Sequence, residues 1–188
     1  MHTNQPLGLN LFAFGRFIVN MRHRLTLLLS AMLISTLPAY GAESDWTAIN
    51  EETLEHFQAM VRLDTADPPG REIDLTHYIT AILDAEGIEY DVFALEENRP
   101  NIVARLRGNG SKRPLLLMAH QDTVNVDATK WTFPPHSAAR DGGWIYGRGT
   151  VDDKDNLVAA LMTMVLLKRQ NVELDRDVIL LAESGEEG

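Results

Sequence analysis

The sequence predicts an α/β domain in which a mostly parallel sheet is flanked by helices. Two uninterrupted apolar runs, residues 115–119 and 178–182, lack alternation and are typical of strands buried on both faces of a parallel sheet. Between them, residues 157–167 are apolar on nearly every side and too long for a typical strand, which indicates a buried helix. A strand, a helix and a second strand in this order are the building unit of an α/β layer.

Two further helices are predicted before the first apolar run. Residues 50–63 carry apolar side chains at helical spacing, and residues 75–85 show the same pattern. The segment 67–70, Asp-Pro-Pro-Gly, separates them, because two prolines cannot continue a helix. Gly87 is placed to end the second helix in a left-handed conformation.

Two strands are expected between the second helix and the first apolar run. They cover residues 89–95 and 101–106, and a polar turn at 96–100 separates them.

The first 41 residues are predicted to form a leader with a secretory signal peptide. A basic segment at 22–24 precedes an apolar run at 25–37, and small residues around Gly41 suit cleavage. The run is shorter than the roughly 20 residues that a spanning helix needs, which favours cleavage over an uncleaved membrane anchor. We therefore expect residues 42–188 in the periplasm or outside the cell, with no stable membrane span.

The composition is that of an acidic globular protein, with 45% hydrophobic and 23% charged residues. There are 17 Lys+Arg against 27 Asp+Glu, and the net charge of −10 argues against nucleic acid or an anionic membrane as a partner. The chain contains no cysteine, which excludes disulfides, thiolate metal ligands and a cysteine nucleophile. Any metal site must therefore use His, Asp and Glu.

Three polar clusters stand where an α/β fold places its sites. His120 and Asp122 follow the first apolar run, and Glu186 and Glu187 follow the second. Asp152 lies in the loop before the buried helix. Because sites gather at the carboxyl ends of strands in open α/β sheets, we expect these five residues to converge on one edge of the sheet.

The residue types suit a hydrolytic metal site without thiolates. Imidazole and carboxylate are the ligands that such a zinc site uses, and two metal ions need a bridging carboxylate. Asp122 can accept the second ring N–H of His120 and orient the ring. Of the adjacent glutamates, one can bind metal while the other takes a proton from water. Taken singly, each cluster is also compatible with a hydrogen-bonded pair, a helix cap or a solvated loop.

Other site types are excluded by their spacing. The segment at 147–149, Gly-Arg-Gly, is not followed by the third glycine of a dinucleotide loop or by a phosphate-binding Gly-Lys-Ser/Thr. The acidic segment at 152–155 lacks the later ligands and the glycine of a calcium-binding loop. The segment at 183–185, Glu-Ser-Gly, lacks the first glycine of a serine nucleophile turn.

Four segments closely resemble, in the right order, the zinc metallopeptidase family that includes carboxypeptidase S, aminoacylase-1 and acetylornithine deacetylase. They are residues 118–124 (MAHQDTV), 131–135 (WTFPP), 141–154 (DGGWIYGRGTVDDK) and 183–188 (ESGEEG). The second segment is most similar to the carboxypeptidase S branch. The resemblance covers roughly residues 50–188 and identifies them as the N-terminal part of a zinc exopeptidase-like catalytic domain, truncated at its C-terminus.

The resemblance implies a role for each of the five candidate residues. His120 would bind one metal ion, Glu187 would bind the other, and Asp152 would bridge the two. Asp122 would orient His120, and Glu186 would be the general base. The implied cofactor is two Zn²⁺ ions, with Co²⁺ or Mn²⁺ as alternatives. A cis peptide bond after Asp152 is also implied.

The implied activity is hydrolysis of amide or peptide bonds, by an exopeptidase or an N-acyl amino acid hydrolase acting on small peptides or N-acyl amino acids. The family's remaining metal ligands and its dimerisation domain would lie beyond Gly188. We therefore expect the 188-residue chain to be inactive alone. A homodimer is a possible assembly of the full-length protein. The alternative is a secreted, non-catalytic domain that binds metal or substrate.

Overall fold

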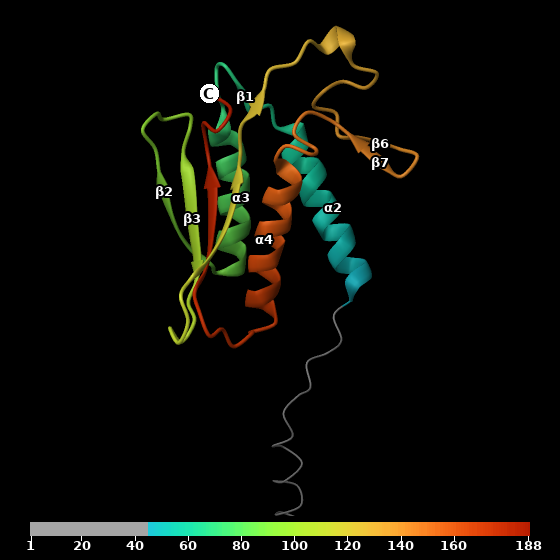
Figure 1. The fold of residues 1–188 in the computed structure, drawn as a ribbon. Coiled ribbons are helices and arrows are strands. Elements are labelled where there is room, and N and C mark those ends of the chain that lie inside the picture. The colour runs from blue at the N-terminus through green and yellow to red at the C-terminus, as the bar shows by residue number, and fades with distance from the viewer. Residues whose placement is uncertain (1–44) are drawn as a thin grey trace, which may run out of the picture. The chain divides into compact units, whose positions relative to one another are not determined.

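A central four-stranded sheet organises the part of the chain that the structure, a computed structural model, describes, residues 45–188 (Figure 1). The strand order is β2-β3-β8-β4. These strands are β2 (Glu89–Phe93), β3 (Asn101–Leu106), β8 (Val178–Glu183) and β4 (Leu115–His120). The leader predicted at residues 1–41 lies outside the described residues.

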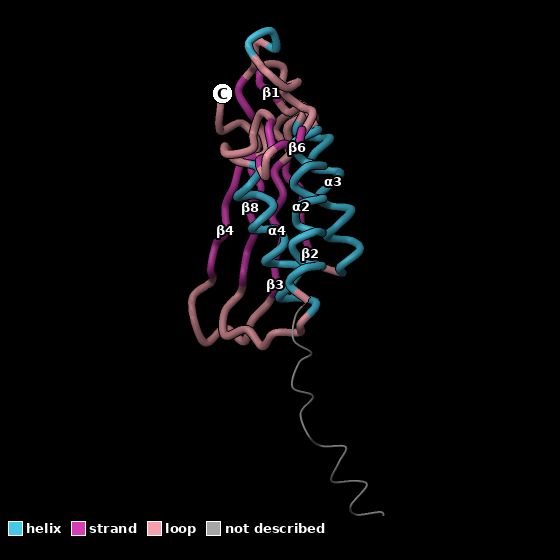
Figure 2. Tube along the Cα trace, turned by 90° about the vertical axis from the view of Figure 1, so that its right-hand side faces the viewer, coloured by secondary structure: helices cyan, strands magenta, loops and turns pink. Residues whose placement is uncertain are grey.

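Three helices lie on one side of this sheet: α2 (Trp46–Arg62), α3 (Glu72–Glu86) and α4 (Lys154–Arg169) (Figure 2). The hydrophobic core forms between α3, α4 and the facing side of the sheet, with Ile79, Leu161 and Leu180 among its fully buried side chains. No helix of the described part is long and apolar enough to cross a membrane.

The predicted helices are present, and local signals set their ends. Helix α2 begins four residues before the predicted start, because Asp45 accepts hydrogen bonds from the first free amides, those of Thr47 and Ala48. Helix α3 ends at Gly87, whose φ of 61° gives the predicted left-handed cap.

The α/β class is confirmed, but the sheet in the described part is mixed rather than mostly parallel. Within the four-stranded sheet only β4 and β8 pair in parallel, and they are the two strands that a helix, α4, connects. Strands β2 and β3 are joined by a short turn and must pair antiparallel, and β3 also pairs antiparallel with β8.

The prediction that residues 115–119 are buried on both faces is wrong for the described part. Strand β4 is the outermost strand of the sheet, with a neighbour on one side only. Its face opposite the helices carries no helix among residues 45–188. Leu116 and Met118 point to that face and are 53% and 57% exposed. Only the end of the strand, Ala119 and His120, is buried.

Four short strands and one short helix were not predicted. Strand β1 (Ala66–Asp67) pairs in parallel with β5 (Thr123–Val124), which fixes the proline-containing loop beside the end of β4. A 3₁₀ turn, η1 (Ala128–Lys130), follows, and then the hairpin of β6 (Ala139–Asp141) and β7 (Trp144–Tyr146). These elements are too short for their periodicity to be read from the sequence.

Candidate metal centre

The ends of β4 and β8 bring the predicted site residues to one edge of the sheet. The two strands are parallel and their last residues, His120 and Glu183, are register partners. In the turn after β8, the backbone N–H of Glu187 donates to the carboxylate of Asp122, just beyond the end of β4. One potential ligand atom from each of His120, Glu186 and Glu187 lies within 4.8 Å of the others.

The ring of His120 is held in one orientation from both sides. Its Nδ1 lies 3.0 Å from the backbone carbonyl oxygen of Asp122. Because a carbonyl oxygen only accepts, Nδ1 carries a proton and donates it. His120 is 7% exposed. Its other nitrogen, Nε2, lies beside the exposed carboxylate of Asp152, on the side from which a ligand can approach.

Asp152 faces that second nitrogen. Its Oδ1 lies 2.9 Å from His120 Nε2, and its side chain is 71% exposed. The peptide bond between Asp152 and Asp153 is cis, as the family resemblance implied. Burial opposes a charge on His120, but the hydrogen bond to Asp152 and the charge of Asp122 outweigh it, so the pKa of His120 is raised.

The carboxylate of Asp122 makes a different contact from the one that the sequence predicts. Its Oδ1 lies 3.4 Å from His120 Nδ1, and the ring N–H donates its hydrogen bond to the backbone carbonyl oxygen of Asp122 instead. Its Oδ2 accepts the backbone N–H of Glu187 at 2.9 Å. Asp122 is fully buried. It thus connects His120 and Glu187, one through its carbonyl and the other through its carboxylate.

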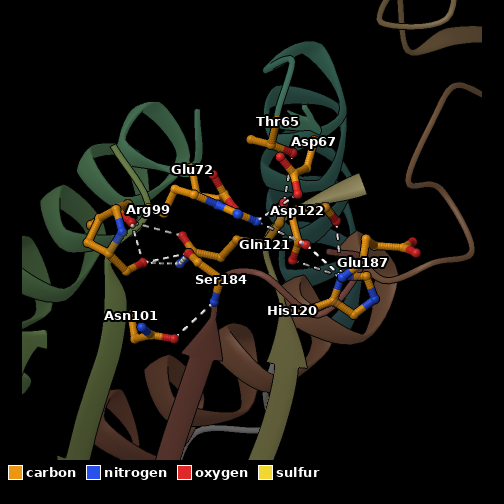
Figure 3. Close-up of polar contacts among 12 residues, drawn as sticks. Thr65, Asp67, Glu72, Arg99, Asn101, His120, Gln121, Asp122, Ser184 and Glu187 are labelled. Carbon is orange, nitrogen blue, oxygen red and sulfur yellow. Dashed lines mark hydrogen bonds and ion pairs between the residues drawn. The ribbon is translucent and has the colours of Figure 1, made fainter. Parts of the chain in front are cut away.

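The side chains of Glu186 and Glu187 differ in exposure. Glu186 is exposed, while Glu187 is partly buried beside His120 (Figure 3). Burial, and then the charge of Asp152, raises the pKa of the Glu187 carboxyl. Carboxylates crowded in this way disfavour their own ionisation, and a bound cation relieves that repulsion.

The N-terminal end of α4 positions Asp152. Asp153 accepts the backbone N–H of His120 at 3.2 Å, so the loop is tied to the end of β4. Lys154, in the first turn of α4, is fully buried and donates from Nζ to the carbonyl oxygens of Met60 and Leu63 at the end of α2. Burial lowers the pKa of Lys154 to about 8.

Gln121 lies between the two site residues in sequence but points the other way. Its side chain is fully buried, and Nε2 donates to the carbonyl oxygen of Pro100 at 2.8 Å. Its Oε1 accepts from the hydroxyl of Thr76 at 3.0 Å, and its backbone N–H donates to Glu183 at 2.7 Å. This anchoring of the ends of β4 and β8 was not predicted, because a lone glutamine carries no recognisable sequence signal.

Comparison with known proteins agrees with the fold and the motif order. Residues 116–188 match the sequence model of the peptidase family M20/M25/M40. A protein named as a probable succinyl-diaminopimelate desuccinylase, from Staphylococcus aureus strain Mu50, is 36% identical over 143 residues, 75% of this chain and 34% of that protein. An N-formyl-4-amino-5-aminomethyl-2-methylpyrimidine deformylase of Halalkalibacterium halodurans is 37% identical over 141 residues, 73% of this chain and 33% of that protein.

A solved structure shows the same arrangement of elements. The M20 family metallo-carboxypeptidase Sso-CP2 from Sulfolobus solfataricus superposes with a TM-score of 0.64 at 29% identity, over 72% of this chain and 31% of that chain. The chain spans about a third of the length of the relatives that it matches. Fold, motif order and relatives agree: the chain belongs to the peptidase family M20/M25/M40.

Proposed function

We propose that the protein carrying this chain is a hydrolase of amide or peptide bonds that uses water activated by two zinc ions. The observation that carries the proposal is the convergence of His120, Glu186 and Glu187 within 4.8 Å, with Asp152 at 2.9 Å from His120 Nε2. The similarity to a metallo-carboxypeptidase and to two enzymes that remove acyl groups supports it.

The donor atoms present fit a zinc site. His120 offers a nitrogen whose tautomer is fixed by its contact with Asp122, and the carboxylates of Asp152 and Glu187 converge beside it. Imidazole and carboxylate are the ligands of hydrolytic zinc sites. The raised pKa values of His120 and Glu187 indicate that this edge concentrates negative charge, which a dication balances.

The chain's own residues would perform the proton transfers. Zinc, when bound, supplies Lewis-acid polarisation of the scissile carbonyl and lowers the pKa of water. Glu186, exposed at the edge of the site, would take a proton from the attacking water while the water oxygen bonds to the amide carbon. When the C–N bond breaks, Glu186 would return that proton to the leaving nitrogen.

The substrate class, compartment and assembly belong to the same proposal. Small peptides and N-acyl amino acids are the substrates that relatives of this kind suggest, through either exopeptidase or deacylase activity. The signal peptide expected in residues 1–41 supports a periplasmic or secreted location. A homodimer of the full-length protein and a carboxypeptidase S-like specificity are further parts of the proposal.

Metal removal tests the proposed function. We expect the longest natural protein that contains this chain to hydrolyse N-acyl amino acids or dipeptides, to lose that activity on chelation and to regain it with Zn²⁺. The measurement is amine release after dialysis against a chelator and after readdition of metal. Metal binding without hydrolysis of any such substrate would favour the alternative, a non-catalytic binding domain.

A further inference from the structure

Arg99 is a cation enclosed at the same edge of the sheet as the candidate metal centre. It precedes β3, and because β3 runs antiparallel to β8, the beginning of β3 lies beside the ends of β8 and β4 (Figure 3). The Arg99 side chain is 16% exposed. No motif includes this residue, and the roles proposed above leave it without a function.

Carboxylates from three separate segments face the guanidinium. Arg99 Nε donates to Glu72 Oε1 of α3 at 3.1 Å, and the Glu72 side chain is fully buried. Arg99 Nη2 lies 3.2 Å from Asp67 Oδ2 of β1 and 3.9 Å from Asp122 Oδ2. The contacts of Nη2 are ionic rather than well-aligned hydrogen bonds, because Nη2 has no hydrogen-bond partner among the described residues.

Two glycines leave the space that the guanidinium occupies. A Cβ on Gly70 would lie 2.8 Å from Arg99 Nε, and a Cβ on Gly185 would lie 3.3 Å from Nη2. Both glycines have positive φ, 71° and 81°. The guanidinium therefore packs between the proline-containing loop and the turn that carries Glu186 and Glu187.

The residues that follow Arg99 fix the same strand ends. The carbonyl oxygen of Pro100 accepts from the hydroxyl of Ser184 at 2.7 Å and from Gln121 Nε2 at 2.8 Å. Asn101 Oδ1 accepts the backbone N–H of Ser184 at 3.0 Å. The start of β3 thus holds the beginning of the turn after β8 through backbone and side-chain hydrogen bonds.

We propose that Arg99 is a positioning residue of the metal centre, acting through Asp122. The proposal rests on the proposed function, because it concerns the geometry of the ligands assigned there. Asp122 is fully buried, with the Arg99 guanidinium 3.9 Å from its Oδ2 and the ring of His120 3.4 Å from its Oδ1. Its Oδ2 receives the N–H of Glu187, and its carbonyl receives the ring N–H of His120.

The guanidinium of Arg99, which contacts Glu72 through Nε and Asp67 and Asp122 through Nη2, therefore sets where two proposed metal ligands lie. Without the guanidinium between them, the buried Asp122 carboxylate would be repelled by Glu72 and Asp67 and would move towards solvent. That movement would release the backbone N–H of Glu187 and would take a negative charge away from Nδ1 of His120, 3.4 Å from Asp122 Oδ1. A guanidinium is suited to this role, because its fork can contact carboxylates on two sides, whereas a lysine ammonium is a point charge.

The test is Co²⁺ binding and turnover of Arg99→Lys, with Arg105→Lys as the matched control. Arg105 is on β3 and pairs with a carboxylate, Asp177 at 2.7 Å, but at the opposite end of the strand. Lysine keeps the positive charge next to Glu72, so Arg99→Lys is designed to remain folded. Measurements use the longest natural protein that contains this chain, freed of metal, with Co²⁺ alone as the binding probe.

We expect Arg99→Lys to weaken Co²⁺ binding at least about tenfold, as is typical when a partner of a metal ligand is removed. We also expect a changed Co²⁺ visible spectrum and a lower kcat with KM little changed, while Arg105→Lys behaves as wild type. A purely structural role would reduce thermal stability but leave the spectrum of the folded, metal-loaded protein unchanged.

Two results would overturn different claims. If the wild-type protein binds no Co²⁺, the proposed function fails, and the role of Arg99 fails with it. If the wild type binds Co²⁺ and Arg99→Lys has the same affinity, spectrum and kcat, only the positioning role is wrong. If Arg99→Lys does not fold, Glu72→Gln replaces it, since the side-chain hydrogen bond of Glu72 in the described part is with Arg99. Unchanged Co²⁺ affinity in folded Glu72→Gln would then overturn the role.

Discussion

Replacing Glu186 by Gln is expected to lower kcat by about three orders of magnitude while the bound metal remains. Glutamine has the same size as glutamate but cannot take a proton from water or return it to the leaving nitrogen. Because His120, Asp152 and Glu187 are the proposed ligands, the metal site keeps its donors. The measurements are turnover of the best dipeptide or N-acyl amino acid substrate and metal content by elemental analysis.

The control for this prediction is Glu173→Gln, because Glu173 is exposed in the loop between α4 and β8. It should keep both wild-type turnover and wild-type metal content. If Glu186→Gln were as active as the wild type, Glu186 would not be the base. If it lost its metal, Glu186 would be a ligand rather than the base, which the proximity of both glutamates to His120 makes a meaningful alternative.

Replacing Lys154 by Ala is expected to lower the free energy of unfolding by about 3 kcal/mol at pH 7. The aliphatic stem of Lys154 is fully buried, so its removal leaves a cavity. The carbonyl oxygens of Met60 and Leu63 also lose their charged donor. Urea unfolding followed by tryptophan fluorescence measures the change, and Lys168→Ala, at the exposed end of α4, should shift it by less than about 0.5 kcal/mol.

The same variant has a distinctive pH dependence. The pKa of Lys154 is about 8 in the folded chain, against an ordinary value of 10.5 in the unfolded chain. Between these values the unfolded chain binds more protons than the folded one, so the stability of the wild type should rise with pH across this window. Lys154→Ala lacks this contribution, and its deficit should grow between pH 8 and 10.5. A deficit below about 1 kcal/mol at pH 7 that does not grow would show that Lys154 does not anchor α4.

The helices and the strands of the central sheet could be predicted from the sequence, because their signals are local. Gly87 ends α3 as predicted, since a glycine after a periodic run is a local signal. The environment of β4 could not be predicted, because Leu116 and Met118 read as buried residues whatever lies opposite them. Burial depends on which elements cover the sheet, and that information is not in the strand.

The candidate site was predictable in its members but not in its contacts. His120, Asp152 and Glu187 follow from residue type and from their place at strand ends and in the loop before α4. That the carbonyl of Asp122, rather than its carboxylate, holds the ring of His120 could not be known, because every residue has a carbonyl.

Arg99 was missed for a topological reason. It reaches the carboxyl ends of β4 and β8 only because β3 pairs antiparallel with β8. The sequence predicts site residues after the ends of parallel strands, and Arg99 lies before the beginning of a strand. A parallel β3 would have placed its beginning at the opposite edge.

The most direct test of the metal centre is a crystal structure of the zinc-loaded protein with anomalous scattering measured on both sides of the zinc absorption edge. The account predicts two zinc peaks, with His120 Nε2 and a Glu187 carboxylate oxygen each about 2.0–2.2 Å from one of them, and Asp152 between the two. Zinc peaks away from these three residues, or no peak at this edge of the sheet, would contradict it.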